Sequence, residues 1–345
     1  MPIAFFAPLY YTINVVSCFP DVGRRLLSVS GKTANFLPCG FAFSEEFDYN
    51  ANGIYSFRSI DMLDSETEFI YLIGTPLGQS YAARMQNRAY EVMGLNMCYA
   101  YCETGSEHLG EIVSGLRRMP NIAGFAVTKP NKEKVLPYLD ELDPLCGKMG
   151  ACNTVLRKED GTLVGYNTDG AGFITSLREE AELDVRGKSF FCIGSGGAGR
   201  AICSELANNG AGKIYITARH RENAESLSEE LNTSFAPIAE SVPHGDFSRV
   251  KDCVAVINAS GVGMVRDGES PMPKEFMLPG QLYFDAAYNP FRTRFLKDAE
   301  DKGCRILNGL GMSLYQGAAQ IKIWTGREAP LEAMRRELLD ILAGK

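Results

Sequence analysis

Short apolar runs alternate with stretches of helical periodicity along the chain from residue 62 onward. The apolar run at residues 69–73 ends at a Gly-Thr-Pro turn, and residues 79–93 then carry apolar side chains at a helical spacing. The same order continues with a strand at 97–101, a helix at about 106–118 and a strand at 122–127. Such alternation is typical of parallel sheets whose strands are joined by crossover helices. The pattern therefore predicts an α/β fold.

The second half of the chain repeats this order after a predicted hairpin. The strands at 154–156 and 163–166 flank the turn KEDG, and the helix that follows Asp169 leads to a new apolar strand at 188–193. The further predicted elements are a strand at 213–217, a helix at 221–231, strands at 253–258, 282–285 and 305–307, and helical segments from about residue 312 onward. A chain of 345 residues exceeds the usual size of a single core, so two domains are expected.

The first 61 residues show neither of these periods. They are rich in aromatic residues and contain turn-forming sequences such as GKTAN and DYNANG. Two interpretations stay open: an extension that packs on the rest of the protein, or an upstream leader with Met62 as the functional start. The apolar beginning lacks the positively charged n-region of a secretory signal, and no stretch reaches the length of a transmembrane helix. A cytoplasmic location is therefore expected.

Composition excludes several classes of function. The formal net charge of -7 gives no overall attraction to nucleic acid or to an anionic membrane, so an anionic small molecule has to be held by a few placed groups. Ten cysteines occur without a CxxC pair, which favours reduced, mostly buried thiols over a disulfide framework. The three histidines form no zinc-binding pattern with them, so no metal site is expected. The sequence leaves open whether the protein is a monomer or a homodimer.

A glycine-rich loop follows an apolar strand and precedes a helical segment. Gly194, Gly196 and Gly199 give the spacing G-x-G-x-x-G, with Gly197 and Ala198 between the last two. In this context the first glycine allows a tight turn, the second lets a pyrophosphate approach the backbone, and the third lets helix and strand pack closely. The phosphates would bind backbone N–H groups at the helix N-terminus. The loop therefore predicts a dinucleotide site.

The end of the next predicted strand indicates which dinucleotide is bound. An NAD site usually has an acidic residue there, which accepts hydrogen bonds from the ribose 2′-hydroxyl. Here the strand ends in Ala218-Arg219-His220-Arg221, and no acidic residue precedes Glu222. Guanidinium groups bind a 2′-phosphate through charge-assisted hydrogen bonds, whereas a carboxylate would repel it. Arg219 therefore favours NADP, and the alternative is a solvated basic turn.

Three polar residues outside this region follow predicted strands or turns. They are Lys132 in VTKPNK, Asn153 in GACNT and Asp169 in YNTDG. Ligands of open α/β sheets bind at the carboxyl ends of the strands. A lysine and an aspartate brought together there form a proton-transfer pair, in which the carboxylate holds the ammonium and the lysine exchanges a proton with the substrate. A surface lysine and a helix-capping aspartate are the alternative interpretation.

The sequence resembles the shikimate dehydrogenase family from about Ile70 to Gly326. The matching segments, in the order of the family, are GTPLGQS, VTKPNKE, MGACNTV, GYNTDGAGF, GSGGAGRA, ITAR, INASGVGM, DAAYNPFRTRF and GMSLYQGAAQIKIWTG. The resemblance implies an N-terminal α/β substrate-binding catalytic domain that is completed by C-terminal helices, with a Rossmann NADP-binding domain inserted into it. The corresponding residues are 62–169 and 309–345 for the substrate domain and 170–308 for the Rossmann domain, and residues 1–61 remain an extension of unknown role.

The resemblance also implies the reaction and the residues that perform it. The reaction is the reversible, NADP-dependent reduction of 3-dehydroshikimate to shikimate in chorismate and aromatic amino acid biosynthesis. Lys132 and Asp169 match the catalytic pair, and Asn153 matches a ligand of the substrate hydroxyls. Arg219 matches the arginine that binds the 2′-phosphate. The further matching positions are Ser80, Thr128, Tyr288 and Gln316 for the substrate and Met312 near the nicotinamide.

One departure from the family affects the substrate. The family usually has two serines in an S-x-S pair that bind the substrate carboxylate, and here the pair reads Ser80-Tyr81-Ala82. Losing a hydrogen bond to a carboxylate costs roughly 1.5–3 kcal/mol if nothing replaces it. Arg84 and Gln86 on the same predicted helix are candidates to compensate, and a solvated Arg84 is the alternative. Two other functions stay open: a quinate/shikimate dehydrogenase that uses NAD, and a non-catalytic dinucleotide-binding regulator with the same fold.

Overall fold

The computed structural model describes residues 63–78, 80–264 and 268–344, and the backbone of four short strands before residue 63. These strands form two antiparallel pairs, β1 (Ser28–Val29) with β2 (Lys32–Thr33) and β3 (Phe47–Tyr49) with β4 (Tyr55–Phe57). The other residues of the segment 1–61, and with them the two interpretations of that segment, lie outside the described residues. No helix in the described part of the chain is long and apolar enough to cross a membrane.

The first six-stranded sheet has the order β6-β5-β7-β9-β10-β8. Strands β5, β6 and β7 are parallel, and β9 is antiparallel both to β7 and to β10, with which it forms a hairpin. The strands are β5 (Glu68–Gly74), β6 (Met97–Glu103), β7 (Ile122–Val127), β8 (Glu141–Leu142), β9 (Thr154–Arg157) and β10 (Leu163–Tyr166). The helices of this part are α1 (Ala82–Met93), α2 (Leu109–Arg118) and α3 (Pro144–Met149), with a 3-10 turn at Leu136–Tyr138. The predicted hairpin and the three parallel strands are confirmed.

The second sheet has six strands, all parallel, in the order β13-β12-β11-β14-β15-β16. The strands are β11 (Ser189–Ile193), β12 (Lys213–Thr217), β13 (Ala239–Ser241), β14 (Ala255–Asn258), β15 (Leu282–Asp285) and β16 (Arg305–Asn308). Along the chain this is the order 3-2-1-4-5-6 of a Rossmann sheet, so the predicted fold class is confirmed. The order reverses between β11 and β14, and dinucleotides bind beyond the carboxyl ends of the strands at such a point.

Alternate residues of the Rossmann strands enter two different cores. On one face, Phe190 and Cys192 of β11 pack with α5 (Gly197–Asn208) and α6 (Arg221–Ser234). On the other face, Phe191 and Ile193 pack with α7 (Arg294–Asp301), with a 3-10 turn at Ser248–Asp252, and with the two methionines that flank the 3-10 turn at Lys274–Phe276. Both faces are buried, which explains why the strand reads as a continuous apolar run rather than an alternating one.

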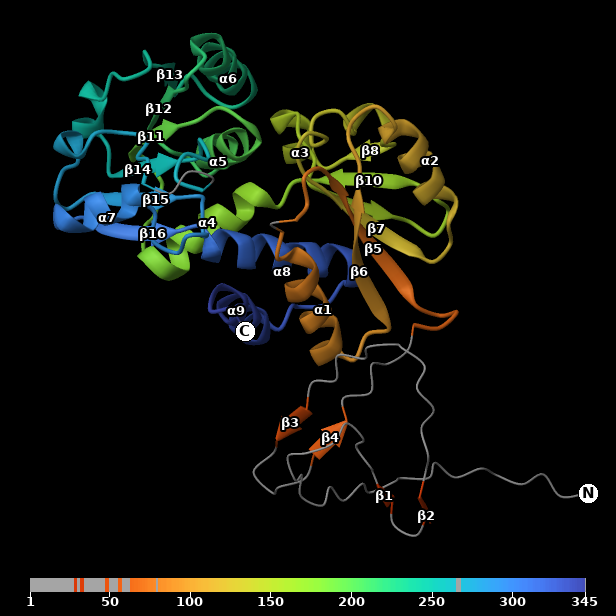
Figure 1. Cartoon of the computed structure of the whole chain (residues 1–345). Coiled ribbons are helices and arrows are strands. Elements are labelled where there is room, and N and C mark those ends of the chain that lie inside the picture. The colour runs from red at the N-terminus through yellow and green to blue at the C-terminus, as the bar shows by residue number, and fades with distance from the viewer. Residues whose placement is uncertain are drawn as a thin grey trace, which may run out of the picture. The chain divides into compact units, whose positions relative to one another are not determined.

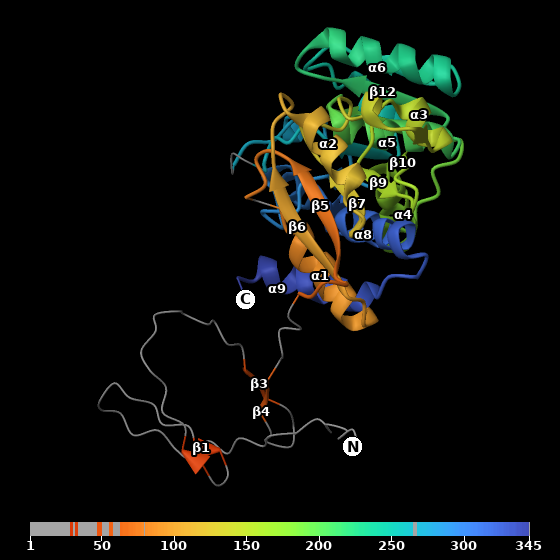
Figure 2. The same ribbon diagram turned by 90° about the vertical axis from the view of Figure 1, so that its right-hand side faces the viewer.

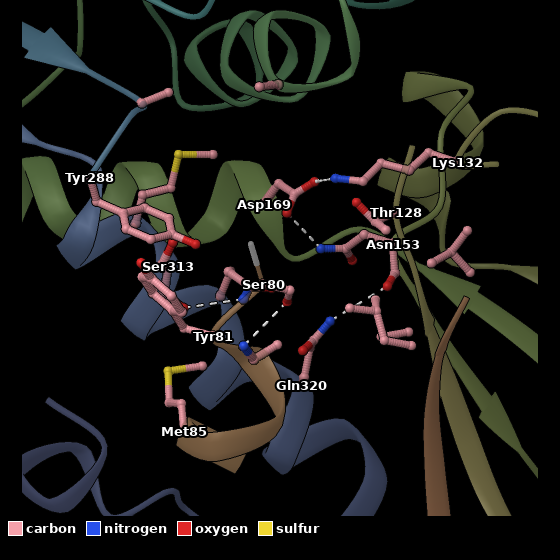
Figure 3. A pocket seen from close by; sticks show the side chains of 18 of the residues that line it. Ser80, Tyr81, Met85, Thr128, Lys132, Asn153, Asp169, Tyr288, Ser313 and Gln320 are labelled. Atoms are coloured by element: carbon pink, nitrogen blue, oxygen red, sulfur yellow. Dashed lines mark hydrogen bonds and ion pairs between the residues drawn. The ribbon is translucent and has the colours of Figure 1, made fainter. Parts of the chain in front are cut away.

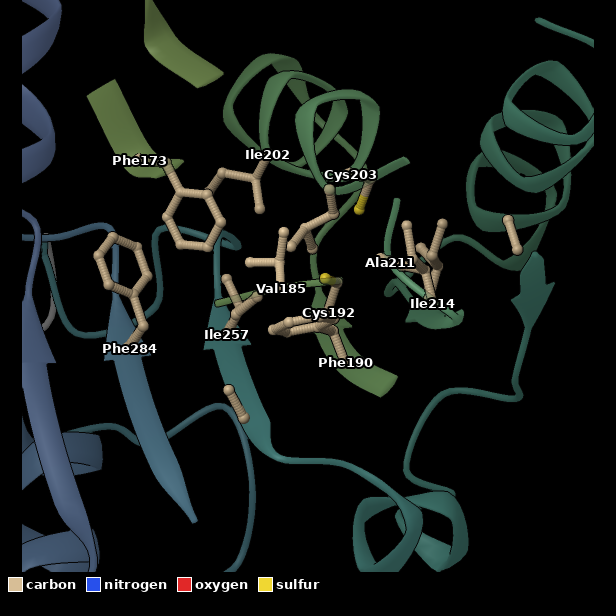
Figure 4. Close-up of a cluster of buried hydrophobic side chains, with 14 of the residues drawn as sticks. Phe173, Val185, Phe190, Cys192, Ile202, Cys203, Ala211, Ile214, Ile257 and Phe284 are labelled. Atoms are coloured by element: carbon tan, nitrogen blue, oxygen red, sulfur yellow. The ribbon is translucent and has the colours of Figure 1, made fainter. Parts of the chain in front are cut away.

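Two helices join the Rossmann sheet to the first sheet (Figure 1). α4 (Asp169–Ala181) packs along α8 (Leu310–Thr325), and the Phe173 ring of α4 meets Phe284 of β15 edge-on at 4.8 Å between ring centroids (Figure 4). α8 also contributes Leu314 and Trp324 to the core of the first sheet. α9 (Leu331–Leu342) then lies beside α1, as Figure 2 shows. The proposed domain boundaries at 169/170 and 308/309 fall at the beginnings of α4 and α8.

Removal of residues 1–61 is expected to leave a folded, active protein that starts at Met62. Residues 63–345 form one compact unit, and its first strand, β5, pairs on both edges with strands of that unit. The described residues of that unit form extensive hydrophobic cores among themselves. Thermal unfolding and turnover of the truncated protein check this expectation. Insoluble or inactive protein would show instead that the N-terminal segment covers apolar surface.

Candidate active site

A cavity of about 210 Å³ lies where the carboxyl ends of β5 and β7 face the Rossmann sheet (Figure 3). Its lining combines residues from the first sheet, from α4 and α8, and from the glycine-rich loop. Of the predicted site residues, the cavity brings together Ser80, Thr128, Lys132, Asn153, Asp169, Ala198, Tyr288, Met312 and Gln316. The substrate and dinucleotide regions predicted from separate parts of the sequence thus meet at one cavity.

Lys132 and Asp169 form an ion pair inside this cavity. The Lys132 ammonium donates to Asp169 Oδ2 at 2.5 Å, and both side chains are largely shielded, with 20% and 13% of their surface exposed. Asp169 is the first residue of α4, where the helix dipole stabilises a carboxylate. The backbone oxygen of Lys132 accepts a hydrogen bond from the Cys152 N–H, which ties the lysine turn to the segment that precedes β9. A lysine held in this way can transfer a proton to a substrate oxygen without first being reoriented.

Asn153 holds the other oxygen of the Asp169 carboxylate. Its Nδ2 donates to Asp169 Oδ1 at 2.8 Å and to Thr168 Oγ1 at 3.0 Å. Its Oδ1 accepts from the Thr168 N–H at 2.9 Å and from the Thr154 hydroxyl at 2.7 Å. One oxygen of the Asp169 carboxylate therefore accepts from the Asn153 amide and the other from the Lys132 ammonium, so the orientation of the carboxylate is fixed.

Hydroxyl groups gather on another side of the cavity. Tyr288 lies beside Tyr81, with 5.7 Å between ring centroids, and burial raises the pKa of Tyr288 to about 12, so it stays a hydrogen-bond donor at neutral pH. Ser313 lines the same cavity as Tyr288. Ser80 precedes α1 instead of lying within the predicted helix at 79–93, and its Oγ accepts from the Ala82 N–H at 3.3 Å. These groups can bind several oxygens of one small polar ligand.

Sequence reasoning missed Ser313 and Gln320, which also line the cavity. With Gln316 they occupy one face of α8, because positions separated by three, four and seven residues lie above one another on a helix. A polar stripe on an otherwise apolar helix that packs between two sheets was the signal that could have revealed them.

Arg84 does not line the cavity, which is a correction to its predicted role. Its guanidinium pairs with Glu337 of α9, at 2.8 Å from Nε and 2.7 Å from Nη2 to Oε1. The residues of α1 that do reach the cavity are Ala82 and Met85. The docking of α9 against α1 thus turns the arginine away from the position where it would compensate for the missing serine.

The glycine-rich loop has the space that a pyrophosphate needs. Gly194 has a φ of +115°, and a Cβ on Gly199 would lie 2.1 Å from the Gly194 carbonyl oxygen, so both positions require glycine for the fold itself. A Cβ on Gly196 would meet nothing within 4 Å, which leaves its surroundings open for a ligand. A Cβ on Gly197 would lie 3.7 Å from Lys132 Cδ, so the loop borders the lysine. The residues present fit a dinucleotide whose reactive end reaches the cavity.

Arg219 lies just beyond the carboxyl end of β12. Its side chain is exposed, whereas the preceding residue, Ala218, is buried. Within the described residues its guanidinium has no hydrogen-bond or ion-pair partner, whereas Arg221 pairs with Glu225 at 2.7 Å. No carboxylate occupies this turn before Glu222. The position therefore offers a free cation where a 2′-phosphate would lie. In the described part of the chain no cluster of three or more His, Cys, Asp or Glu side chains could hold a metal ion.

Two family models match the chain. The "Shikimate dehydrogenase substrate binding domain" matches residues 72–155, and the "Shikimate 5'-dehydrogenase C-terminal domain" matches residues 309–339. The first match contains Lys132 and Asn153, and the second contains Met312 and Gln316.

Individual proteins match over most of the chain. The shikimate dehydrogenase (NADP(+)) of Moorella thermoacetica is 39% identical over 282 residues, which are 81% of this chain and 95% of that protein. The structure of shikimate 5-dehydrogenase from Listeria monocytogenes in complex with shikimate and NAD is 37% identical, with a TM-score of 0.76 over 81% of this chain and 98% of that one. Quinate dehydrogenase from Corynebacterium glutamicum in complex with NAD is 26% identical, with a TM-score of 0.75 over 79% and 99%.

Proposed function

The chain belongs to the shikimate dehydrogenase family, and on that premise we propose that it catalyses the reversible, NADP-dependent reduction of 3-dehydroshikimate to shikimate. The reaction would serve chorismate and aromatic amino acid biosynthesis. The observation that carries the proposal is the Lys132–Asp169 ion pair, which lies in the cavity beside the glycine-rich loop. A non-catalytic dinucleotide sensor would need the loop but not a shielded proton-transfer pair.

Three residues of the cavity have different roles in the proposed reaction. Lys132 gives a proton to the oxygen of the ketone as negative charge develops there, and its own charge stabilises that oxygen. Asp169 keeps the ammonium in place, and Asn153 keeps the carboxylate in place. When bound, NADPH supplies the hydride. In the reverse direction Lys132 takes the proton from the hydroxyl.

The cofactor would be held by backbone N–H groups of the loop from Gly194 to Gly199 and by Arg219. The loop continues into α5 at Gly197, and the dipole of that helix favours the pyrophosphate at its N-terminus. Arg219 supplies the charge for a 2′-phosphate. Met312 and Ala198 border the cavity between the loop and the substrate residues, where the nicotinamide would lie.

The test is an absorbance assay for reduced nicotinamide, with shikimate and quinate each offered with NADP⁺ and with NAD⁺. Turnover is expected to be fastest with shikimate and NADP⁺. A preference for quinate and NAD⁺ would support the second candidate function, because the missing hydroxyl at Ala82 leaves the choice of ring acid open. No turnover with any combination would contradict a dehydrogenase and favour a regulator.

Substitution of Ala82 by serine is expected to lower KM for shikimate about fivefold. Ala82 lines the cavity next to Ser80, so the new hydroxyl can reach the same ligand, and the net gain of such a bond is about 1 kcal/mol. Arg84→Ala is the control on the same helix, and KM should stay nearly unchanged because Arg84 pairs with Glu337. Steady-state kinetics decides between these positions. A steep rise of KM for shikimate in Arg84→Ala would show instead that Arg84 binds the substrate carboxylate.

We propose that the enzyme works in the cytoplasm. All eight cysteines in the described part of the chain are free thiols, and most are buried. Burial raises the pKa of the Cys253 thiol to about 12, so this thiol stays protonated and unreactive at neutral pH. Such cysteines suit a reducing compartment. Fractionation of cells with an antibody to the protein tests the location.

A further inference from the structure

A chain of buried side-chain hydrogen bonds leads from α1 through α8 to the carboxylate of Asp169. Gln86 Nε2 donates to Gln320 Oε1 at 3.1 Å, and Gln320 Nε2 donates to Thr154 Oγ1 at 3.0 Å. The Thr154 hydroxyl donates to Asn153 Oδ1 at 2.7 Å, and Asn153 Nδ2 donates to Asp169 Oδ1 at 2.8 Å. Every link has its donor on the side of α1 and its acceptor on the side of the aspartate.

Backbone groups fix this direction at both ends of the chain. Gln86 Nε2 lies 3.2 Å from the Gly317 carbonyl oxygen, which can only accept, so the amide of Gln86 cannot be reversed. Asn153 Oδ1 lies 2.9 Å from the Thr168 N–H, which can only donate. With both ends fixed, the single proton of the Thr154 hydroxyl has to point at Asn153, because Gln320 already presents its amide N–H to the same oxygen.

The members of the chain expose almost no surface, although Asn153 and Gln320 border the cavity. Gln86 and Thr154 are fully buried, and Asn153 and Gln320 are 2% and 3% exposed. A buried polar group that loses its partner stays unsatisfied, so each member holds its neighbour in one orientation. Gln316, one turn earlier on α8, differs in that it is half-buried and bonds to Thr168 and to the backbone of Ser313.

We infer that Thr154 and Gln320 are positioning residues for the reaction, an inference that rests on the proposed function. Thr154 holds the amide of Asn153 in its orientation together with the Thr168 N–H, and Gln320 sets the direction of the Thr154 hydroxyl. With the amide in this orientation an N–H group faces Asp169; with the amide reversed, a carbonyl oxygen would face the carboxylate and repel it. The chain thus keeps Asp169 aimed at Lys132 while neither Thr154 nor Gln320 transfers a proton to substrate.

The test measures kcat and KM of Thr154→Val, which has nearly the same shape but no hydroxyl. Because Thr168 still donates to Asn153 Oδ1, the loss is that of one hydrogen bond: kcat should fall about 3- to 10-fold, and KM for NADP⁺ should stay within about twofold. Thr154→Ser keeps the hydroxyl and should restore kcat. Gln320→Met should lower kcat in the same way, by about 2- to 5-fold.

A double-mutant cycle with Asn153→Ala separates positioning from a general loss of stability. If Thr154 acts through Asn153, Thr154→Val should change kcat by less than about twofold in the Asn153→Ala background. An equal loss in both backgrounds would overturn the inference, as would a folded Thr154→Val enzyme with normal kcat. If Thr154→Val fails to fold, the same cycle is run with Gln320→Met.

Gln281→Met is the matched control for Gln320→Met. Gln281 is also buried, and its amide donates to the Val250 and Cys253 carbonyl oxygens of the Rossmann core at 2.7 and 2.6 Å, away from Asp169. Its kcat should stay normal even if the melting temperature falls, and a loss equal to that of Gln320→Met would overturn the inference. Failure of the proposed function is distinguishable, because the unaltered enzyme would then turn over neither ring acid.

Discussion

Replacing Lys132 by alanine is expected to lower kcat by at least about 10²-fold, because general acid catalysis by a placed group is commonly worth about 10²–10⁴. The structure gives the reason: the ammonium is held at 2.5 Å by Asp169 inside the cavity, so a water molecule could not replace it with the same direction and charge. Affinity for NADP⁺ should change little, because the phosphates would bind the loop rather than the lysine. Turnover and cofactor binding of the purified variant are the measurements.

The fold should survive this change. Asp169 keeps the hydrogen bond from Asn153 Nδ2 and its place at the N-terminus of α4, so it is not left as an unpaired buried charge. Lys129→Ala is the matched control, since this lysine is exposed and lies in the same turn. It should keep normal turnover. Near-normal kcat in Lys132→Ala would remove the lysine from the mechanism, whatever the control does.

Replacing Arg219 by alanine is expected to raise KM for NADP⁺ about 10- to 100-fold and to leave KM for NAD⁺ unchanged, because one charge-assisted contact to a phosphate is worth about 1.5–3 kcal/mol. Arg219 has no partner within the described residues, so its removal breaks no internal bond of the protein. The effect should therefore be confined to the cofactor that carries the 2′-phosphate. Kinetics with both cofactors measures it.

Arg186→Ala is the control for that experiment. Arg186 belongs to the same domain, but it precedes β11 and so lies at the opposite edge of the sheet, where it pairs with Asp184 at 2.8 Å. Neither KM should respond to its loss. Equal weakening of NADP⁺ and NAD⁺ by Arg219→Ala would instead assign Arg219 a role in folding.

Local patterns determined most of the fold. The apolar run at 69–73 became β5 (Glu68–Gly74), and the predicted strands at 213–217 and 282–285 were found with the same bounds. These elements could be predicted from sequence because burial of a strand, or of one face of a helix, requires apolar residues at a characteristic spacing along the chain. Helix α7 was missed although Thr293 caps it, with Oγ1 accepting from the Leu296 N–H at 3.4 Å, because a helix of two turns shows too little of its period.

The motif residues were also accessible from sequence, since each had a local reason for its type. Gly194 and Gly199 are required by the geometry of the backbone within a few residues. The resemblance to a family identified Lys132 and Asp169 as a pair. That the lysine and the aspartate are in hydrogen-bonding distance, 37 residues apart in the chain, is a property of the sheet that carries them.

Only the tertiary structure decided which polar side chains of the helices reach the cavity. Arg84 and Gln86 lie two positions apart on α1, yet Arg84 pairs with Glu337, 253 residues away, and Gln86 bonds to Gln320, 234 residues away. Helical periodicity states that these side chains point in different directions, but it does not state which direction is occupied by α8, by α9 or by a ligand. That assignment depends on how helices pack across the whole chain, and contacts between distant segments leave no period in the sequence of either segment.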